Sequence, residues 1–115
     1  MQFIAKAFHV RMSPYKLRTL ADVVRGKNVL YALDWLATHP VRRAMPVRKV
    51  IESAAGNAKH LKGIDPQYLV IKEIKVDEGP VIRYFRPGAM GRANVQKKRL
   101  SHISVIVKSV DDKEA

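Results

Sequence analysis

Ser13 and Lys16 are spaced as S-x-x-K, the pattern in which acyl-transfer enzymes use a lysine to deprotonate a serine nucleophile. The companion S-D-N and K-T-G elements are absent, and a serine before Pro14 is expected to cap a helix. The 4 histidines show no paired ligand spacing, and cysteine is absent. We therefore expect no catalytic residue, no metal site and no cofactor, and we predict that the chain is not an enzyme.

The residue types favour phosphate binding instead. The chain has 22 Lys and Arg against 10 Asp and Glu, a formal net charge of +12. No acidic residue lies between Glu78 and Asp111, whereas that interval holds Arg83, Arg86, Arg92, Lys97, Lys98, Arg99 and Lys108. Unpaired charges of this kind cannot be buried without a cost of several kcal/mol each. The natural complement of the interval is therefore a polyanion.

The centre of this basic interval is different in character. Its sequence is Arg86-Pro87-Gly88-Ala89-Met90-Gly91-Arg92, and Pro87-Gly88 suits the middle of a type II turn. Tyr84 and Phe85 offer aromatic faces between the cations, on which bases can stack. We interpret the interval as a β-hairpin whose arms contact nucleic acid. Its weakly charged tip either contacts something other than phosphate or simply requires tight turn geometry.

Two further basic groups lie earlier in the chain. The first is opposed only by Asp22, and Ser13 adds the free N–H groups of a helix start; it comprises Lys6, Arg11, Lys16, Arg18, Arg25 and Lys27. The second comprises Arg42, Arg43, Arg48 and Lys49. For both groups an ordinary solvated surface is an open alternative. His102 is the histidine best placed for a phosphate or base contact.

Composition narrows the class of protein. No continuous apolar stretch approaches the roughly 18 residues of a membrane-spanning helix, and no basic start precedes an apolar signal core. The absence of cysteine fits a reducing compartment. We expect a cytoplasmic protein with a nucleic-acid partner and no membrane insertion.

Hydrophobic spacing predicts a strand over 3–12 and then three helices. On the strand, Ile4, Phe8 and Val10 share one face, opposite Ala5 and Ala7. Ser13 is expected to cap the first helix with its side chain, and Gly26 to end it in the left-handed region. Asn28 is expected to cap the second, which His39-Pro40 ends.

A third helix is expected to run to about Lys62 with Leu61 on its buried face, starting near Pro46. Its Gly56 costs about 1 kcal/mol relative to Ala, so we predict that another element approaches closely there.

From Tyr68 the period becomes two, with Val70, Ile74 and Val76 alternating against polar residues, and Asp77-Glu78-Gly79-Pro80 interrupts the pattern. The return strand is expected over 94–110. The predicted fold is α+β, a small globule of three helices on a three-stranded antiparallel sheet, with a long protruding β-hairpin. We expect one domain over 1–115, with its globular part about 1–80 and 100–110, a basic hairpin about 81–100, and a disordered tail over 111–115.

Several stretches together resemble one family, in order and over nearly the whole chain. They are Ser13-Pro14-Tyr15-Lys16-Leu17-Arg18, Val24-Arg25-Gly26-Lys27, Glu52-Ser53-Ala54-Ala55-Gly56-Asn57-Ala58, Val76-Asp77-Glu78-Gly79-Pro80, and the tip sequence leading to Lys98-Arg99-Leu100-Ser101-His102-Ile103. The chain resembles the bacterial type of the large-subunit ribosomal protein L twenty-two family. The resemblance implies a structural protein that binds large-subunit ribosomal RNA, supports assembly, contacts neighbouring ribosomal proteins and acts as a monomer within the ribosome.

The resemblance also assigns residues. It implies a tip that lines the nascent-peptide exit tunnel, at Pro87, Gly88, Ala89, Met90, Gly91 and Arg92. It implies RNA contacts by the hairpin at Arg83, Arg86, Lys97, Lys98, Arg99 and His102, and by the first helix at Ser13, Lys16, Arg18, Arg25 and Lys27. Gly88 and Met90 stand where the family is commonly more basic. The rival interpretation is an architectural DNA-binding protein with a basic β-arm, although such dimers need an extensive apolar face.

Overall fold

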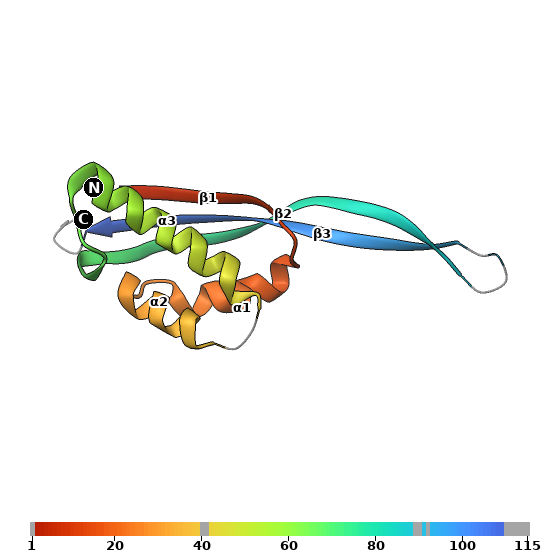
Figure 1. The fold of residues 1–115 in the computed structure, drawn as a ribbon, viewed down its shortest axis with the longest axis horizontal. Coiled ribbons are helices and arrows are strands. Elements are labelled where there is room, and N and C mark those ends of the chain that lie inside the picture. The colour runs from red at the N-terminus through yellow and green to blue at the C-terminus, as the bar shows by residue number, and fades with distance from the viewer. Residues whose placement is uncertain (1, 40–41, 89–90, 92, 110–115) are drawn as a thin grey trace.

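The computed structural model describes residues 2–39, 42–88, 91 and 93–109. Its elements follow the order β1 (Gln2–Val10), α1 (Pro14–Val24), α2 (Val29–Thr38), α3 (Ala44–Lys62), the 3-10 turn η1 (Pro66–Tyr68), β2 (Leu69–Pro87) and β3 (Ala93–Ser109). Figure 1 shows α1, α2 and α3 gathered at one end of the long ribbon formed by β2 and β3. This arrangement confirms the predicted α+β fold.

The three strands form one antiparallel sheet in the order β1-β3-β2. β3 is central because it pairs with β1 through Phe3↔Val107 and with β2 through Val76↔Ile103. Alternate residues of β3, including Ile103, Val105 and Val107, are buried, whereas Ile4 on the opposite face of the sheet is 52% exposed. All three helices therefore cover the same face of the sheet.

The core lies between that face and the apolar stripes of the helices. α1 contributes Leu17, Leu20, Ala21 and Val24, α2 contributes Val29, Ala32 and Leu36, and α3 contributes seven residues from Ala44 to Ala58. On β1 the buried side chains are Phe3 and Ala5, while Phe8 is exposed. A bulge between Ile71 and Glu73 lets both Ile71 and Ile74 face the core, so strict alternation fails there.

Several local predictions are confirmed. Gly26 has φ +79° just after α1, and the Asn28 side chain accepts a hydrogen bond from the Leu30 N–H at 2.9 Å. α3 ends at Lys62, followed by Gly63 with φ +67°. The interruption at Gly79 and Pro80 is a register shift between Glu78 and Val81, within one continuous strand β2.

Other local predictions are wrong. A Cβ placed on Gly56 would meet nothing within 4 Å, so no element approaches this glycine. Leu61 is 64% exposed, because the last turn of α3 extends beyond the sheet-facing core. α3 begins at Ala44, since proline is tolerated within the first helical turn and Pro46 does not delay the start.

Beyond the shift at Glu78 the ribbon continues as an arm, which we define as residues 81–87 of β2 and 93–99 of β3. Its pairing runs from Val81↔Arg99 to Pro87↔Ala93. The molecule measures 64 × 25 × 25 Å, and Figure 1 shows the arm extending away from the helices. We call residues 2–39, 42–80 and 100–109 the globule. The predictions for Ala89, Met90, Arg92 and the tail lie outside the described residues.

Candidate nucleic-acid interface

Three basic segments that are far apart in the sequence meet where the arm leaves the globule. They line one open hollow of about 470 Å³, formed by Arg11, Met12, Ser13, Lys16, Arg42, Arg43, Lys98 and Arg99. We call this the basic hollow. Its residues come from the bend after β1, the start of α1, the segment before α3 and the base of the arm. The tertiary structure therefore brings together six cations from segments that lie far apart in the sequence.

Among the described residues, no acidic side chain lines the basic hollow. Ion pairs of the described residues join Arg25 to Asp22, Arg48 to Glu52 and Lys75 to Glu73, and none of them involves a cation of the hollow. Six clustered positive charges without counter-charges produce a strong local potential that attracts phosphates. Lys98 and Arg99 are exposed and can reach a ligand without rearrangement of the core.

One buried hydrogen bond fixes the wall of the hollow. The Ser101 hydroxyl donates to the Met12 carbonyl at 2.6 Å, and Ser101 is fully buried. The same stretch is held by the pairing Val10↔Ser101. Because Ser101 follows Lys98 and Arg99 on β3, this bond ties the α1 side of the hollow to the base of the arm. No pattern of residues in the sequence predicts this contact.

Ser13 lies at the N-cap position of α1 but makes no capping hydrogen bond with its side chain, which corrects the predicted cap. Its backbone is extended, with φ −66° and ψ 135°, and buried Pro14 starts the helix. The serine side chain lines the basic hollow instead. Its hydroxyl is therefore available to a ligand, together with the N–H groups of the first helical turn.

Known proteins resemble this chain over almost its whole length. Residues 5–108 match the family model of ribosomal protein L22p/L17e. The chain belongs to this family. It is similar to the large ribosomal subunit protein uL22 of Synechococcus sp. (strain JA-2-3B'a(2-13)), with 44% identity over 111 residues, covering 96% of this chain and 90% of the relative. It is 48% identical over 110 residues to uL22 of Desulfitobacterium hafniense (strain Y51), covering 96% and 95%.

Membership of a ribosomal protein family argues against the alternative of an architectural DNA-binding protein. Of the predicted RNA-contact residues, the fold brings Arg11, Ser13, Lys16, Lys98 and Arg99 into the hollow. Arg42 and Arg43 also line it, although they are not among the residues predicted to contact RNA. Their signal was a pair of adjacent cations in a loop, which becomes informative only once the loop is placed beside the arm.

Two other cations of the predicted site use some of their N–H groups for hydrogen bonds within the protein. Arg18 donates from Nε to the Val76 carbonyl at 3.1 Å and lies over the Tyr15 ring. Arg25 bonds to Asp22 and to the Ile74 carbonyl at 2.8 Å. These bonds fasten α1 to β2 beside the sheet. RNA contacts by both arginines stay predictions.

Lys6 and Lys27 lie outside the basic hollow. Lys6 lines a separate hollow on the open face of the sheet, together with Lys75 and the two acidic residues Glu73 and Asp77. Lys27 lies over the Tyr31 ring, with 6.0 Å from Nζ to the ring centroid. The fold therefore does not unite these two lysines with the hollow.

His102 is packed at the base of the arm. Its Nδ1 accepts a hydrogen bond from the His9 N–H at 3.2 Å, and its ring contacts Phe8 and His9 edge-on. His9 has φ 58°, an unfavourable backbone conformation at the irregularity between Ala7 and Val10. Nδ1 is therefore occupied, and an RNA contact by the other ring nitrogen, Nε2, stays a prediction.

The arm carries the remaining predicted residues. Arg83 is exposed, and Arg99 lines both the basic hollow and a second hollow that includes Arg83 and Leu100. Backbone pairing sets Arg83 opposite Lys97, and Arg86 opposite Asn94. Pro87 ends β2, Gly88 follows it, and Gly91 has φ +78°. The arm cations thus extend along the ribbon away from the hollow.

Among the described residues no group of three or more His, Asp or Glu side chains could hold a metal ion. Within the same residues, no helix is both long and apolar enough to cross a bilayer.

Proposed function

We propose that this chain is a structural, non-enzymatic constituent of the cytoplasmic large ribosomal subunit that binds ribosomal RNA with its basic hollow and arm. The observation that carries the proposal is the convergence of Arg11, Lys16, Arg42, Arg43, Lys98 and Arg99 around one hollow without acidic residues. Family membership supports it, because the similar proteins are named large ribosomal subunit proteins.

The mechanism is electrostatic clamping. The hollow holds phosphates of folded RNA at the base of the arm, and the arm cations continue the contact outward. Val81 and Ile82 of the arm are exposed, and an isolated hairpin is marginally stable, so RNA provides the surface that the arm lies against. In this position the protein supports subunit assembly beside neighbouring ribosomal proteins.

The tip has a separate role in this proposal. Pro87 to Gly91 carries no charge, whereas both flanking stretches are basic. We assign the tip, from Pro87 to Arg92, to the wall of the peptide exit tunnel and to contact with the nascent peptide. Deleting Ala89 and Met90 should leave incorporation into large subunits nearly intact and change the response of a peptide-stalling reporter. A large incorporation defect with normal stalling would contradict this assignment.

Co-sedimentation with large subunits on a sucrose gradient is the direct test in cells. The variant carrying Lys98→Ala and Arg99→Ala should compete poorly with the tagged wild-type chain for large subunits. The matched control carries Lys59→Ala and Lys62→Ala, two exposed cations at the far end of α3. Equal competition by both double variants would show that the hollow does not anchor the protein.

Salt dependence tests the mechanism in vitro. If about six phosphates are neutralised, the logarithm of affinity should fall against the logarithm of salt with a slope of roughly −4 to −5. Losing Lys98 and Arg99 should make that slope shallower by about 1.4 to 1.8. A slope near zero for the wild-type chain would refute electrostatic clamping.

A further inference from the structure

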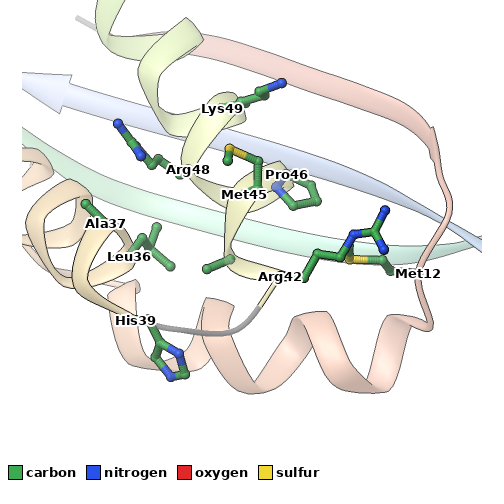
Figure 2. A pocket seen from close by; sticks show the side chains of 10 residues that line it. Met12, Leu36, Ala37, His39, Arg42, Met45, Pro46, Arg48 and Lys49 are labelled. Carbon is green, nitrogen blue, oxygen red and sulfur yellow. The ribbon is translucent and has the colours of Figure 1, made fainter.

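Another hollow, distinct from the one beside Arg83, adjoins the basic hollow and is mainly apolar. It measures about 420 Å³, and its walls are mainly apolar, with cations at the edge; they are Met12, Leu36, Ala37, His39, Arg42, Ala44, Met45, Pro46, Arg48 and Lys49. Figure 2 shows Leu36 and Ala37 from α2 beside Met45 and Pro46 from α3, with Met12 and Arg42 at one end. We call it the apolar hollow. The two hollows share Met12 and Arg42, so they are continuous.

Each hollow contains one buried nitrogen that lacks a partner. His39 Nδ1, at the apolar hollow, and Arg43 Nε, at the basic hollow, make no hydrogen bond with any residue that the structure describes. A buried polar atom without a partner is unfavourable. Because Nδ1 and Nε have almost no accessible surface, a ligand would contact the other polar groups of these side chains, with a hydrogen-bonding edge at His39 Nε2 and an anionic group at the terminal N–H groups of Arg43.

A nucleotide has this combination of groups. Its base has flat apolar faces and a polar edge, and its phosphates are anionic. In an RNA duplex the bases are stacked inside, whereas unpaired bases in loops and bulges can be splayed out and bound individually. An apolar protein segment would fill the apolar hollow but would leave the six neighbouring cations without counter-charges.

We propose that the two hollows together bind one unpaired RNA nucleotide, with its base in the apolar hollow and its flanking phosphates in the basic hollow. Met45 and Pro46 contact the face of the base, His39 contacts its edge, and shared Arg42 contacts the adjoining phosphate. This inference rests on the RNA-binding function proposed above and names the form of RNA that the site selects.

The test uses the full chain and a set of RNA hairpins with the same stem. Four hairpins carry a single-nucleotide bulge, one for each base; a fifth carries an abasic bulge, and a sixth has no bulge. Binding is measured by fluorescence anisotropy at one fixed salt concentration. At least one base-carrying bulge should bind about fivefold more tightly than the abasic bulge, the lower end of what insertion of one base contributes.

Variants separate the two hollows. Ala37→Phe fills the apolar hollow from an exposed position on α2, and His39→Phe keeps a ring beside Trp35 while removing both nitrogens. Both should abolish or reduce the preference for a base and leave affinity for the abasic bulge unchanged. Arg43→Ala should weaken all six hairpins alike. Leu61→Ala, which removes an exposed apolar side chain outside both hollows, should change nothing.

The outcomes distinguish this inference from the function on which it rests. Weak, salt-independent binding of all six hairpins would reject RNA binding itself. Tight, salt-dependent and equal binding of all six would retain RNA binding and overturn the nucleotide site, leaving the apolar hollow to a protein partner. Thermal unfolding midpoints establish that each variant is folded. If Ala37→Phe fails to fold, His39→Phe alone decides, and an unchanged base preference in it would overturn the role of the histidine.

Discussion

The globule and the arm share two strands, yet they are stabilised in different ways. Within the globule, β3 buries Ile103, Val105 and Val107 beneath three helices. On the arm, Val81 and Ile82 are 47% and 48% exposed, although backbone pairing continues without a break to Pro87. Pairing alone removes little apolar surface from water, and an isolated hairpin is marginally stable at best. The same strands are therefore self-sufficient in one region and dependent on a partner in the other.

The basic hollow lies at the junction of these two regions. Its cations come from both sides, with Lys16 on the globule and Lys98 on the arm. Phosphates bound there would reduce repulsion between the two parts and hold the arm in place. Under the proposed function, the junction is thus the place where bound RNA would stabilise the arm.

Hydrogen exchange on the free protein should reveal the largest difference. We expect the amide of Val105 to exchange at least about 10³-fold more slowly than that of Arg83, because the first opens with global unfolding and the second by local fraying. The measurement is residue-resolved exchange by NMR without RNA. Comparable protection factors for the two amides would show that the arm is stable by itself, and that it does not differ from the globule in stability.

Matched truncations should show the next largest effect. Ile51→Ala removes a fully buried side chain of α3 and should lower the free energy of unfolding by about 2–5 kcal/mol. Ile82→Ala, on the arm, should change it by no more than about 0.5 kcal/mol. Chemical denaturation of both variants checks this. A loss above 1–2 kcal/mol for the arm variant would mean that the arm takes part in the cooperative fold.

The junction itself should respond to loss of one hydroxyl. Ser101→Ala leaves the Met12 carbonyl without its buried donor and should cost about 1–3 kcal/mol in stability. It should also weaken RNA binding, since the α1 side of the basic hollow is then no longer tied to the arm. Ser53→Ala, at an exposed position on α3, is the control. Unchanged stability and RNA affinity in Ser101→Ala would remove this bond from the explanation.

The smallest effect tests whether the globule is optimised for stability. Gly56→Ala should stabilise the protein by about 0.5–1 kcal/mol, because the position is helical, exposed and open. Gly63→Ala should destabilise it, since Gly63 adopts φ +67°. The thermal unfolding midpoints of the two variants should therefore shift in opposite directions relative to the wild-type chain. Destabilisation by Gly56→Ala would reveal a contact at that glycine that the free chain does not show.

Much of the fold was predictable because its signals are local. Asn28, Gly26 and the apolar spacing of α1 to α3 act within a few residues, so capping and periodicity located the helices. Errors arose at positions whose burial depends on tertiary packing rather than on the neighbouring sequence. Leu61 continues the apolar spacing of α3 beyond the end of the surface that it packs on, and Ile71 is buried through a bulge that alternation does not encode.

The candidate site divides in the same way. The sequence alone determined the excess of positive charge, the long acid-free interval and the motifs of the L22p/L17e family, since these depend on residue type and order. Only the tertiary structure decided which cations act together. Arg42 and Lys98 are separated by nearly half of the chain. They line one hollow because α3, which begins just after Arg42, packs against β1 and β3. Electrostatic potential adds over distance in space, so a binding site for phosphate is set by the fold that gathers the charges.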